Sequence, residues 1–417
     1  MNGRYQPNWL RSNFLLSFVF DSSKFTTYDF YDSNTKFLSM TTLLQRAPQD
    51  WRDIGGLDTA EEIAHQPAMW RELAAGLAAE QARVAAFLGG CLADPSQRVI
   101  LTGAGSSAYA GEIIADELNA AWPAQVRAVA TTSLLTHPEL YLETDAPTLL
   151  VSFARSGNSP ESTAAVSLLR ELVPGARFLN ITCNPDGQLA QHGAGDAAVC
   201  NLLMPAASCD RGFAMTSSFT CMLLAALSVL GREPQLQRLE QLAALGEEAL
   251  ATWSSPLATL GAQPVSRVVY LGSGPLEALA KEAALKILEL TGGRVLAVAN
   301  SPLGFRHGPK AMLNEETLVV MFRSAKPLAR QYEHDLLQEL QREKVAGRCL
   351  TVGCGAHIGI DAPAWPDAWL APLWLLMAQQ YALHQSALLQ LRPDNPFTGG
   401  TVNRVVQGVT IYRHDQF

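Results

Sequence analysis

The sequence has few charged residues, and the charge that it has is mostly negative. Asp, Glu, Lys and Arg make up 17% of the 417 residues, and 31 Lys and Arg stand against 39 Asp and Glu, a formal net charge of −8. An acidic protein repels the phosphates of nucleic acids, which are bound through Lys and Arg. We therefore expect no nucleic-acid partner.

The sequence also lacks a C-x-x-C pair of cysteines. Its seven cysteines are an odd number and include no C-x-x-C motif. A disulfide framework uses an even number of cysteines, and a structural zinc site needs closely spaced ligands. We therefore expect reduced cysteines in the cytoplasm and no metal centre.

No apolar run is as long as a membrane span. Residues 219–230 are mostly apolar but number only 12, and residues 369–391 are interrupted by Pro372, Gln379, Gln380, His384 and Gln385. A helix needs about 20 apolar residues to cross a bilayer. Both segments are predicted to be buried helices, and no membrane association is expected.

The first 39 residues differ in composition from the rest of the chain. They contain no Ala but six of the fifteen Phe. A signal peptide would combine a basic start, an apolar run and a small-residue cleavage site, but Asp21 directly follows the apolar residues 14–20. We interpret residues 1–39 as a leader, an extension added with an expression vector, or translation from a start upstream of Met40.

Short, continuously apolar runs alternate with helical patterns over most of the remaining chain. This alternation predicts parallel β-sheets with helices on both faces. The first series of predicted strands covers 98–102, 126–130, 148–153, 177–183 and 198–204. The second series covers 267–271, 294–299, 318–323 and 349–353.

The two series of strands are related by an internal repeat. Residues 99–105 and 268–274 match in pattern at an offset of 169, and an Ala-rich helix follows each. We therefore predict two similar α/β domains. The predicted order is a helical arm at 40–92, domain one at 93–235, a linker helix at 236–255, domain two at 256–395 and a tail at 396–417.

A Gly-rich loop follows the first strand. Gly103-Ala-Gly105-Ser-Ser-Ala108 fits the dinucleotide-binding fingerprint, which also requires an acidic residue about 20 positions further on to bind the ribose. The next predicted strand ends instead in Thr131-Thr-Ser133. The sequence therefore argues against a nicotinamide, and we expect no cofactor.

A second polar loop follows the strand at 148–153. Ser159 before Pro160 fits an N-cap with proline at the first helical position, so capping alone could explain it. Capping needs one hydroxyl, however, and this loop also supplies Ser156. Together with Ser106 and Ser107 it would place hydroxyls at two helix N-termini, where anions bind. We favour a phosphate site.

These motifs resemble the sugar isomerase (SIS) domain, the phosphosugar module also found in glucosamine-6-phosphate synthase. The resemblance covers roughly residues 78–406 and implies two tandem SIS domains, each a five-stranded parallel, flavodoxin-like α/β sheet flanked by helices. The synthase has Ser-Gln-Ser where this chain has Ala154-Arg155-Ser156, so one hydroxyl is replaced. The resemblance and the loop pattern together assign the phosphosugar to Gly105, Ser106, Ser107, Arg155, Ser156 and Ser159.

Three charged residues of the second repeat are spaced for one helical face. Glu282, Lys286 and Glu289 stand at i, i+4 and i+7, which by itself fits an exposed ion-paired helix. With His307-Gly-Pro309, however, they resemble the catalytic stretch of the synthase's isomerase half. That resemblance implies that Glu289 moves the proton, that His307 opens the sugar ring across a dimer interface, and that Lys286 and Glu282 orient base and substrate.

From about Met40 onward the chain resembles the bacterial double-SIS proteins known as galactosamine-6-phosphate deaminases or tagatose-6-phosphate ketose/aldose isomerases. The segments that carry this resemblance are 52–61, 102–111, 152–159 and 392–398. It implies conversion of D-galactosamine 6-phosphate to D-tagatose 6-phosphate and ammonium by a homodimer or larger homo-oligomer with shared active sites.

Alternatives to this activity remain open. Residues 40–95 are too few for the synthase's glutamine-hydrolysing domain, so a glutamine-driven amination is disfavoured. The chain could instead isomerise or deglycate glucosamine 6-phosphate, fructosamine 6-phosphate or tagatose 6-phosphate, or it could sense phosphosugars as a non-catalytic regulator. Its tail lacks the lysine of the synthase tail and offers Asn403 or Arg404.

Overall fold

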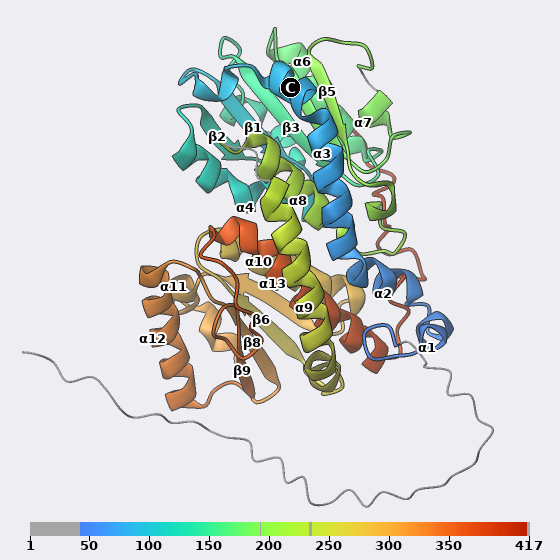
Figure 1. Ribbon diagram of the computed structural model, residues 1–417, viewed down its shortest axis with the longest axis vertical. Coiled ribbons are helices and arrows are strands. Elements are labelled where there is room, and N and C mark those ends of the chain that lie inside the picture. The colour runs from blue at the N-terminus through green and yellow to red at the C-terminus, as the bar shows by residue number, and fades with distance from the viewer. Residues whose placement is uncertain (1–41, 192, 233–235, 415–417) are drawn as a thin grey trace, which may run out of the picture. The chain divides into compact units, whose positions relative to one another are not determined.

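The computed structural model describes residues 42–191, 193–232 and 236–414 (Figure 1). The segment 1–39, predicted to be an extension, lies outside these residues. Within them, no helix is both long enough and apolar enough to span a bilayer.

The first repeat forms a five-stranded parallel sheet, as predicted. Its strand order is β2-β1-β3-β4-β5, the flavodoxin-like order. The strands are β1 (Arg98–Thr102), β2 (Gln125–Ala128), β3 (Thr148–Ala154), β4 (Arg177–Thr182) and β5 (Val199–Leu203). Alternate residues of β1 point to opposite faces, so Val99 packs with α4 (Ser106–Ala121) and α8 (Ser217–Leu230), and Ile100 with α5 (Thr131–Thr136) and α6 (Pro160–Leu172).

The second repeat forms a parallel sheet with the order β7-β6-β8-β9. Its strands are β6 (Arg267–Leu271), β7 (Leu296–Asn300), β8 (Thr317–Phe322) and β9 (Arg348–Val352). One face packs against α10 (Pro275–Leu290) and α13 (Asp367–Leu388), and the other against α11 (Pro302–Phe305) and α12 (Pro327–Glu343). All nine predicted strands are confirmed to within two residues at each end.

The prediction of five strands was wrong for the second repeat, whose described sheet has four. After β9 the chain makes one isolated parallel bridge, between Val352 and Ile358, before α13 begins. Pro363 and Pro366 follow within this segment. Proline has no N–H to donate to a ladder, so the segment cannot continue as a fifth strand.

A layer of helices lies between the two sheets and belongs to one shared core (Figure 1). In it, α3 (Gln66–Leu88) and α13 both pack on α9 (Leu236–Gly261), and α10 packs on α4. Helix α9 is longer than the predicted linker helix at 236–255, because it continues through Pro256. Burial of Leu257 and Leu260 in the core offsets the backbone hydrogen bond that Pro256 cannot make.

The predicted N-terminal arm is mainly helical from Pro48 onward, after a short turn closed by a bridge between Leu43 and Arg46. It comprises α1 (Pro48–Asp53), α2 (Leu57–Ala64) and α3. The remaining short helices are η1 (Cys91–Ala93), η2 (Pro138–Leu140), α7 (Gln188–Gln191), η3 (Ala206–Ser208) and η4 (Pro309–Met312).

The C-terminal tail returns from the second repeat to the first. After α13, Asp394 accepts a hydrogen bond from the N–H of Thr59 in α2 (2.8 Å), and His414 Nδ1 lies 3.9 Å from Glu171 Oε2 in α6. The tail therefore passes over the carboxyl ends of the first sheet's strands.

Candidate active site at the junction of the two repeats

A cavity of about 250 Å³ opens at the carboxyl ends of β1 and β3. Ligands bind at this edge of open parallel sheets. Seven predicted site residues line it, namely Gly105, Ser106, Ser107, Arg155, Ser156, Ser159 and Glu289. The other described walls include Phe213, Met215, Leu285 and tail residues 402–406. The structure thus brings both serine loops of the first repeat to one carboxylate of the second.

Two glycines shape the first loop. Gly105 has φ 57° and ψ −130°, a backbone conformation that side chains disfavour, and it leads directly into α4. A Cβ on Gly103 would lie 2.6 Å from the backbone of Ser107, so only glycine lets helix and strand approach this closely. Ser106 and Ser107 therefore occupy the first turn of α4, where the positive end of the helix dipole attracts an anion.

The four serines differ in how strongly the protein already binds their hydroxyls. Ser106 Oγ accepts a hydrogen bond from Lys286 Nζ (3.0 Å). Ser159 is the N-cap of α6, since its Oγ accepts from the N–H of Ser162 (3.3 Å) and donates to Ser162 Oγ (2.7 Å). The predicted capping role of Ser159 is thus confirmed.

Two of these serines have hydroxyls that the protein holds only weakly. Among the described residues, Ser107 Oγ donates one long hydrogen bond to Met215 Sδ (3.9 Å), and Ser156 Oγ accepts a hydrogen bond from the N–H of Asn158 (3.2 Å). Ser107 and Ser156 are therefore the serines best able to donate to a phosphate.

Arg155 lies buried in the cavity wall. Its guanidinium donates to the carbonyls of Phe213 (3.0 Å), Gly212 (3.3 Å) and Arg404 (3.1 Å). Burial lowers the pKa of Arg155, and so does the nearby Arg404. Arg155 therefore connects the first repeat to the tail while it adds positive charge beside the cavity.

The three charged residues of α10 form a buried cluster, which excludes the exposed ion-paired helix that their spacing also allowed. Lys286 and Glu282 have no exposed surface, and Lys286 Nζ lies 3.2 Å from Glu282 Oε1 and 2.6 Å from Glu289 Oε2. Glu289 has a side chain 20% exposed and faces the cavity, whereas Glu282 and Lys286 lie behind it.

Burial sets the protonation of this cluster. It raises the pKa of Glu282 to about 7, an effect that Lys286 opposes and Glu289 reinforces. Burial alone would lower the pKa of Lys286, but the two carboxylates together raise it above its usual value. Lys286 therefore stays charged beside Glu289, as a buried cation with a carboxylate on each side.

Sequence reasoning missed the loop at 210–213, which contributes Phe213 to the wall of the cavity. Its Asp210 caps α8 by accepting hydrogen bonds from the N–H groups of Thr216, Ser217 and Ser218. Arg404 of the tail donates to the carbonyls of Asp210 and Gly212 (3.1 Å to Gly212). The Thr-Ser-Ser run at the start of α8 is typical of a capped helix N-terminus, so it could have indicated the contact with Asp210.

Glu62 of α2 holds the same loop by accepting the N–H groups of Arg211 and Gly212. Burial and the charge of Asp210 raise the pKa of Glu62 to about 8. A carboxyl group whose pKa is higher in the folded state than in the unfolded state stabilises the fold when it is protonated. The contribution of Glu62 is therefore complete below the unfolded pKa of 4.5 and is lost as the pH rises through about 8.

We therefore expect the melting temperature to fall as the pH rises across this window, and to fall less in Glu62→Gln, which cannot ionise. Thermal unfolding followed by circular dichroism at several pH values measures both slopes. Equal slopes in the two proteins would contradict the assignment.

The described residues that line the cavity do not include His307. His307 is exposed in the turn after α11, and Phe305 next to it packs in the core on the α12 side of the second sheet. Helix α10 covers the opposite face of that sheet. Within one chain, therefore, His307 and Glu289 are not brought together.

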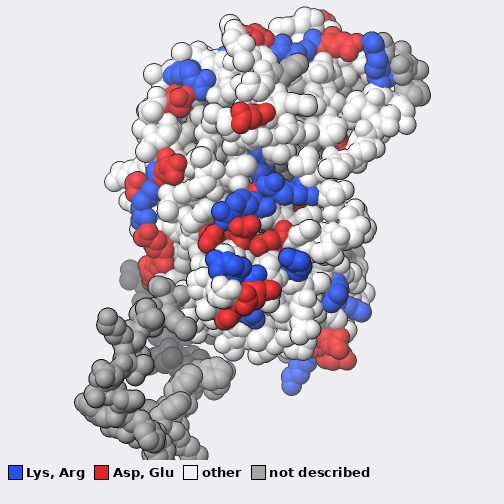
Figure 2. Space-filling model, turned by 90° about the vertical axis from the view of Figure 1, so that its right-hand side faces the viewer, with Lys and Arg blue, Asp and Glu red and all other residues white. Residues whose placement is uncertain are grey.

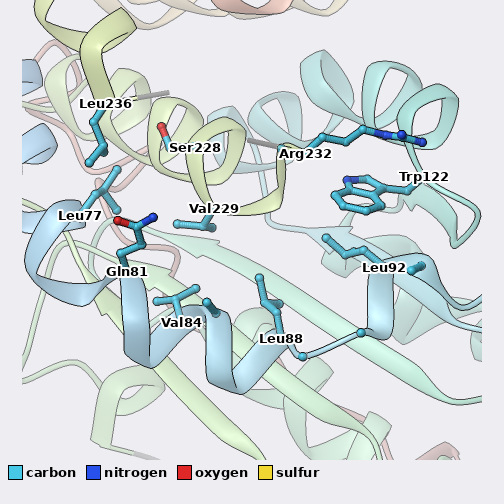
Figure 3. Close-up of a pocket in the computed structure, with 15 residues that line it drawn as sticks. Leu77, Gln81, Val84, Leu88, Leu92, Trp122, Ser228, Val229, Arg232 and Leu236 are labelled. Carbon is cyan, nitrogen blue, oxygen red and sulfur yellow. The ribbon is translucent and has the colours of Figure 1, made fainter. Parts of the chain in front are cut away.

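A separate apolar cavity of about 290 Å³ lies between α3 and the end of α8 (Figure 3). Arg232 is the one ionisable residue among its described lining residues. Its Nε donates to the carbonyl of Ala121, and its guanidinium lies 5.3 Å from the centre of the Trp122 ring. This cavity therefore lacks the acid and base that sugar isomerisation needs.

The charges on the molecular surface are mixed. On the face in Figure 2, basic and acidic side chains lie beside one another and most of the surface is uncharged. This arrangement agrees with the small charged fraction of the sequence.

Comparisons with known proteins identify the family to which this chain belongs. The SIS domain model matches residues 92–230, which is the first repeat. The D-galactosamine-6-phosphate deaminase AgaS of Shewanella sp. (strain ANA-3) is 44% identical over 362 residues, covering 86% of this chain and 92% of that protein. This chain belongs to the AgaS family of SIS-domain proteins.

A further AgaS protein and a solved structure support the same family and fold. The D-galactosamine-6-phosphate deaminase AgaS of Escherichia coli is 44% identical over 368 residues, covering 86% of this chain and 96% of that protein. The crystal structure of the tagatose-6-phosphate ketose/aldose isomerase from Escherichia coli superposes with a TM-score of 0.80 at 40% identity, covering 86% of this chain and 97% of that one. The predicted fold of two SIS domains is thereby confirmed.

Proposed function

We propose that this protein is an isomerising deaminase that converts D-galactosamine 6-phosphate and water into D-tagatose 6-phosphate and ammonium. The observation that supports it most is the cavity that Glu289 of the second repeat lines together with Ser107 and Ser156 of the first, whose hydroxyls the protein holds only weakly. The names of the AgaS relatives supply the sugar.

In this proposal the first repeat binds the phosphate. Ser107 and Ser156 donate their hydroxyl protons to its oxygens, and the N-termini of α4 and α6 add their positive dipole ends. The phosphate anchors one end of the open-chain sugar and positions its other end at Glu289.

Glu289 then transfers a proton between two carbons. It removes the proton from C2 of the open-chain aldehyde and returns it to C1, which converts the amino aldose through an enolamine into a C2 imine. Water adds to this imine, and ammonia leaves to give the ketose. Lys286, 2.6 Å from Glu289, holds the carboxylate in place from behind.

His307 opens the sugar ring from a second copy of the chain in this proposal. The surface around α11 and α12 exposes apolar side chains, with Leu303 44%, Leu328 65% and Tyr332 43% exposed. An exposed apolar patch is typical of an interaction surface. A homodimer with shared sites would bring His307 to the cavity that its own chain does not let it reach.

Mixing two inactive variants tests the shared site. A Glu289→Gln chain and a His307→Ala chain should each be inactive alone, and their mixture should recover up to about a quarter of the activity, because half of randomly paired dimers are mixed and each carries one intact site. The readout is ammonia release after the mixture has exchanged subunits. Without recovery in a mixture shown to contain mixed dimers, His307 does not act across the interface.

The proposed activity is tested by substrate comparison. Ammonia and ketose are measured with galactosamine 6-phosphate, glucosamine 6-phosphate and fructosamine 6-phosphate, and ketose–aldose exchange with tagatose 6-phosphate. We expect the largest kcat/KM and both products with galactosamine 6-phosphate. A preference for another sugar would indicate the isomerase or deglycase alternative, and binding without turnover the regulator.

Removing a phosphate ligand should raise KM rather than lower kcat. Hydrogen bonds to a charged group contribute about 1.5–3 kcal/mol, so Ser107→Ala and Ser156→Ala should each raise KM by roughly 10- to 150-fold. Ser167→Ala is the matched control, because Ser167 lies on the exposed side of α6 and bonds only within its own helix. An unchanged KM in both cavity variants would contradict the phosphate site.

Ser159→Ala should have a different effect. Because its hydroxyl caps α6, this variant loses about 1 kcal/mol of stability, and its melting temperature falls. The comparison of melting temperatures separates the capping serine from Ser107 and Ser156.

A further inference from the structure

The second repeat contains the same loop frame that forms the cavity in the first. Arg323-Ser324 follows β8 as Arg155-Ser156 follows β3, and each loop leads into a helix that begins with proline. Gly274 before α10 has φ 57° and ψ −126°, nearly the values of Gly105 before α4. The two loops thus share their backbone course, with Pro275 and Leu276 in the second repeat where the first has Ser106 and Ser107.

In the second repeat, two carboxylates of the chain already fill this place. Glu333 of α12 accepts hydrogen bonds from Ser324 N (3.2 Å), Ser273 Oγ (3.1 Å) and Arg323 Nε (3.1 Å). Asp367 at the start of α13 accepts from Ala325 N (2.7 Å) and from Ser324 Oγ. Glu333 is completely buried and Asp367 is 3% exposed.

Glu333 has no carboxylate counterpart in the first domain. Glu333 stands six positions after the proline that begins α12, and the residue six positions after Pro160 in α6 is Val166, which is buried in the apolar core. The first domain thus folds with an apolar side chain at this point of the helix.

The helix that faces each loop also differs in charge. At the repeat offset of 169, Lys286 beside the first loop corresponds to Glu117 in α4. Glu117 Oε1 accepts the N–H of Ala368, the neighbour of Asp367 (3.3 Å). The cation Lys286 therefore lies beside the loop of the first repeat, and the carboxylate of Glu117 lies beside the loop of the second. This difference is expected if the first loop binds an external anion and the second binds a carboxylate of its own chain.

We infer that the second repeat keeps a phosphate-binding loop that the chain itself occupies, with the carboxylate of Glu333 in the place of the phosphate. One chain consequently binds one phosphosugar rather than two. This inference rests on the proposed phosphate site of the first repeat, and it identifies Glu333 as the residue that closes the second. Removing its carboxylate opens a second anion site.

The experiment uses the full chain and inorganic phosphate as the probe. The parent is the double variant Ser107→Ala/Ser156→Ala, in which the first site is weakened, and Glu333→Val, the counterpart of Val166, is added to it. Phosphate should raise the melting temperature of the triple variant but not of the parent, and calorimetry should find one phosphate per chain. The control is Glu339→Val on the same helix, where Glu339 pairs at the surface with Arg306 (2.9 Å).

Each result of this experiment either supports or overturns the inference. If phosphate stabilises the triple variant no more than the parent and the Glu339→Val control, the inference is wrong. If the triple variant does not fold without phosphate, added phosphate should restore its folding, and a failure to do so also overturns the inference. The proposed function is judged separately, since its failure would appear as equal phosphate stabilisation of the wild type and the parent.

Discussion

Glu289→Gln is expected to abolish ammonia release while substrate binding remains largely intact. The amide has the shape of the carboxylate but cannot take the C2 proton, and general base catalysis contributes about 10²- to 10⁴-fold to the rate. Lys286 retains Glu282 at 3.2 Å, so the buried charge keeps one partner and the fold should persist.

This expectation is checked by kcat from ammonia release and by calorimetric binding of galactosamine 6-phosphate. The matched control is Glu277→Gln, near the start of the same helix and outside the described lining of the cavity. Near wild-type turnover in Glu289→Gln would exclude Glu289 as the base. Loss of binding together with turnover would point to a structural role instead.

Lys286→Met should be the most damaging single substitution for stability and should also eliminate activity. The side chain is fully buried between two carboxylates and also donates to Ser106 Oγ (3.0 Å). Removing one partner of a buried ion pair costs about 3–5 kcal/mol, because the charge that remains is uncompensated. The base would also lose the cation that holds it.

A second substitution separates the two effects. Lys286→Met/Glu282→Gln removes one of the stranded carboxylates, so it should recover much of the stability and none of the activity. Chemical denaturation measures the free energy of unfolding, and ammonia release measures turnover. The double variant would argue against the buried cluster if it were no more stable than Lys286→Met.

The pH dependence of Lys286→Met supplies a further check. Burial raises the pKa of Glu282 to about 7 even with the lysine present. A carboxyl with a raised pKa is tolerated while protonated, and the fold loses stability as the pH rises through that value. The stability deficit of Lys286→Met should therefore be larger above pH 7 than below it.

The sequence predicted the strands well because their signal is local. Continuous apolar runs that end at Gly103 and Gly272 mark buried parallel strands, and both domains follow this pattern. The missing fifth strand of the second repeat follows from Pro363 and Pro366, a local signal that runs against the family resemblance. Helix α9 passes through Pro256 because tertiary burial outweighs the local penalty.

The candidate site was only partly predictable. The serine loops could be found from their composition, but composition does not show which hydroxyls are free, and the hydrogen bonds of Ser106 and Ser159 decide that. Glu62 carries no motif and acts through contacts with Arg211 and Gly212, about 150 positions away in the chain. No local pattern reports such a contact.

The sequence by itself determined the repeat, the two parallel sheets and the residue types at the candidate site, since periodicity and turn residues act over short distances along the chain. Tertiary structure alone decided how these residues meet. It buries Lys286 against Ser106 across 180 positions, brings Arg404 to Gly212 across 192 and separates His307 from Glu289. It also places Glu333 against the loop after β8, because the packing of α12 on its sheet, and not the spacing of the sequence, determines what that loop contacts.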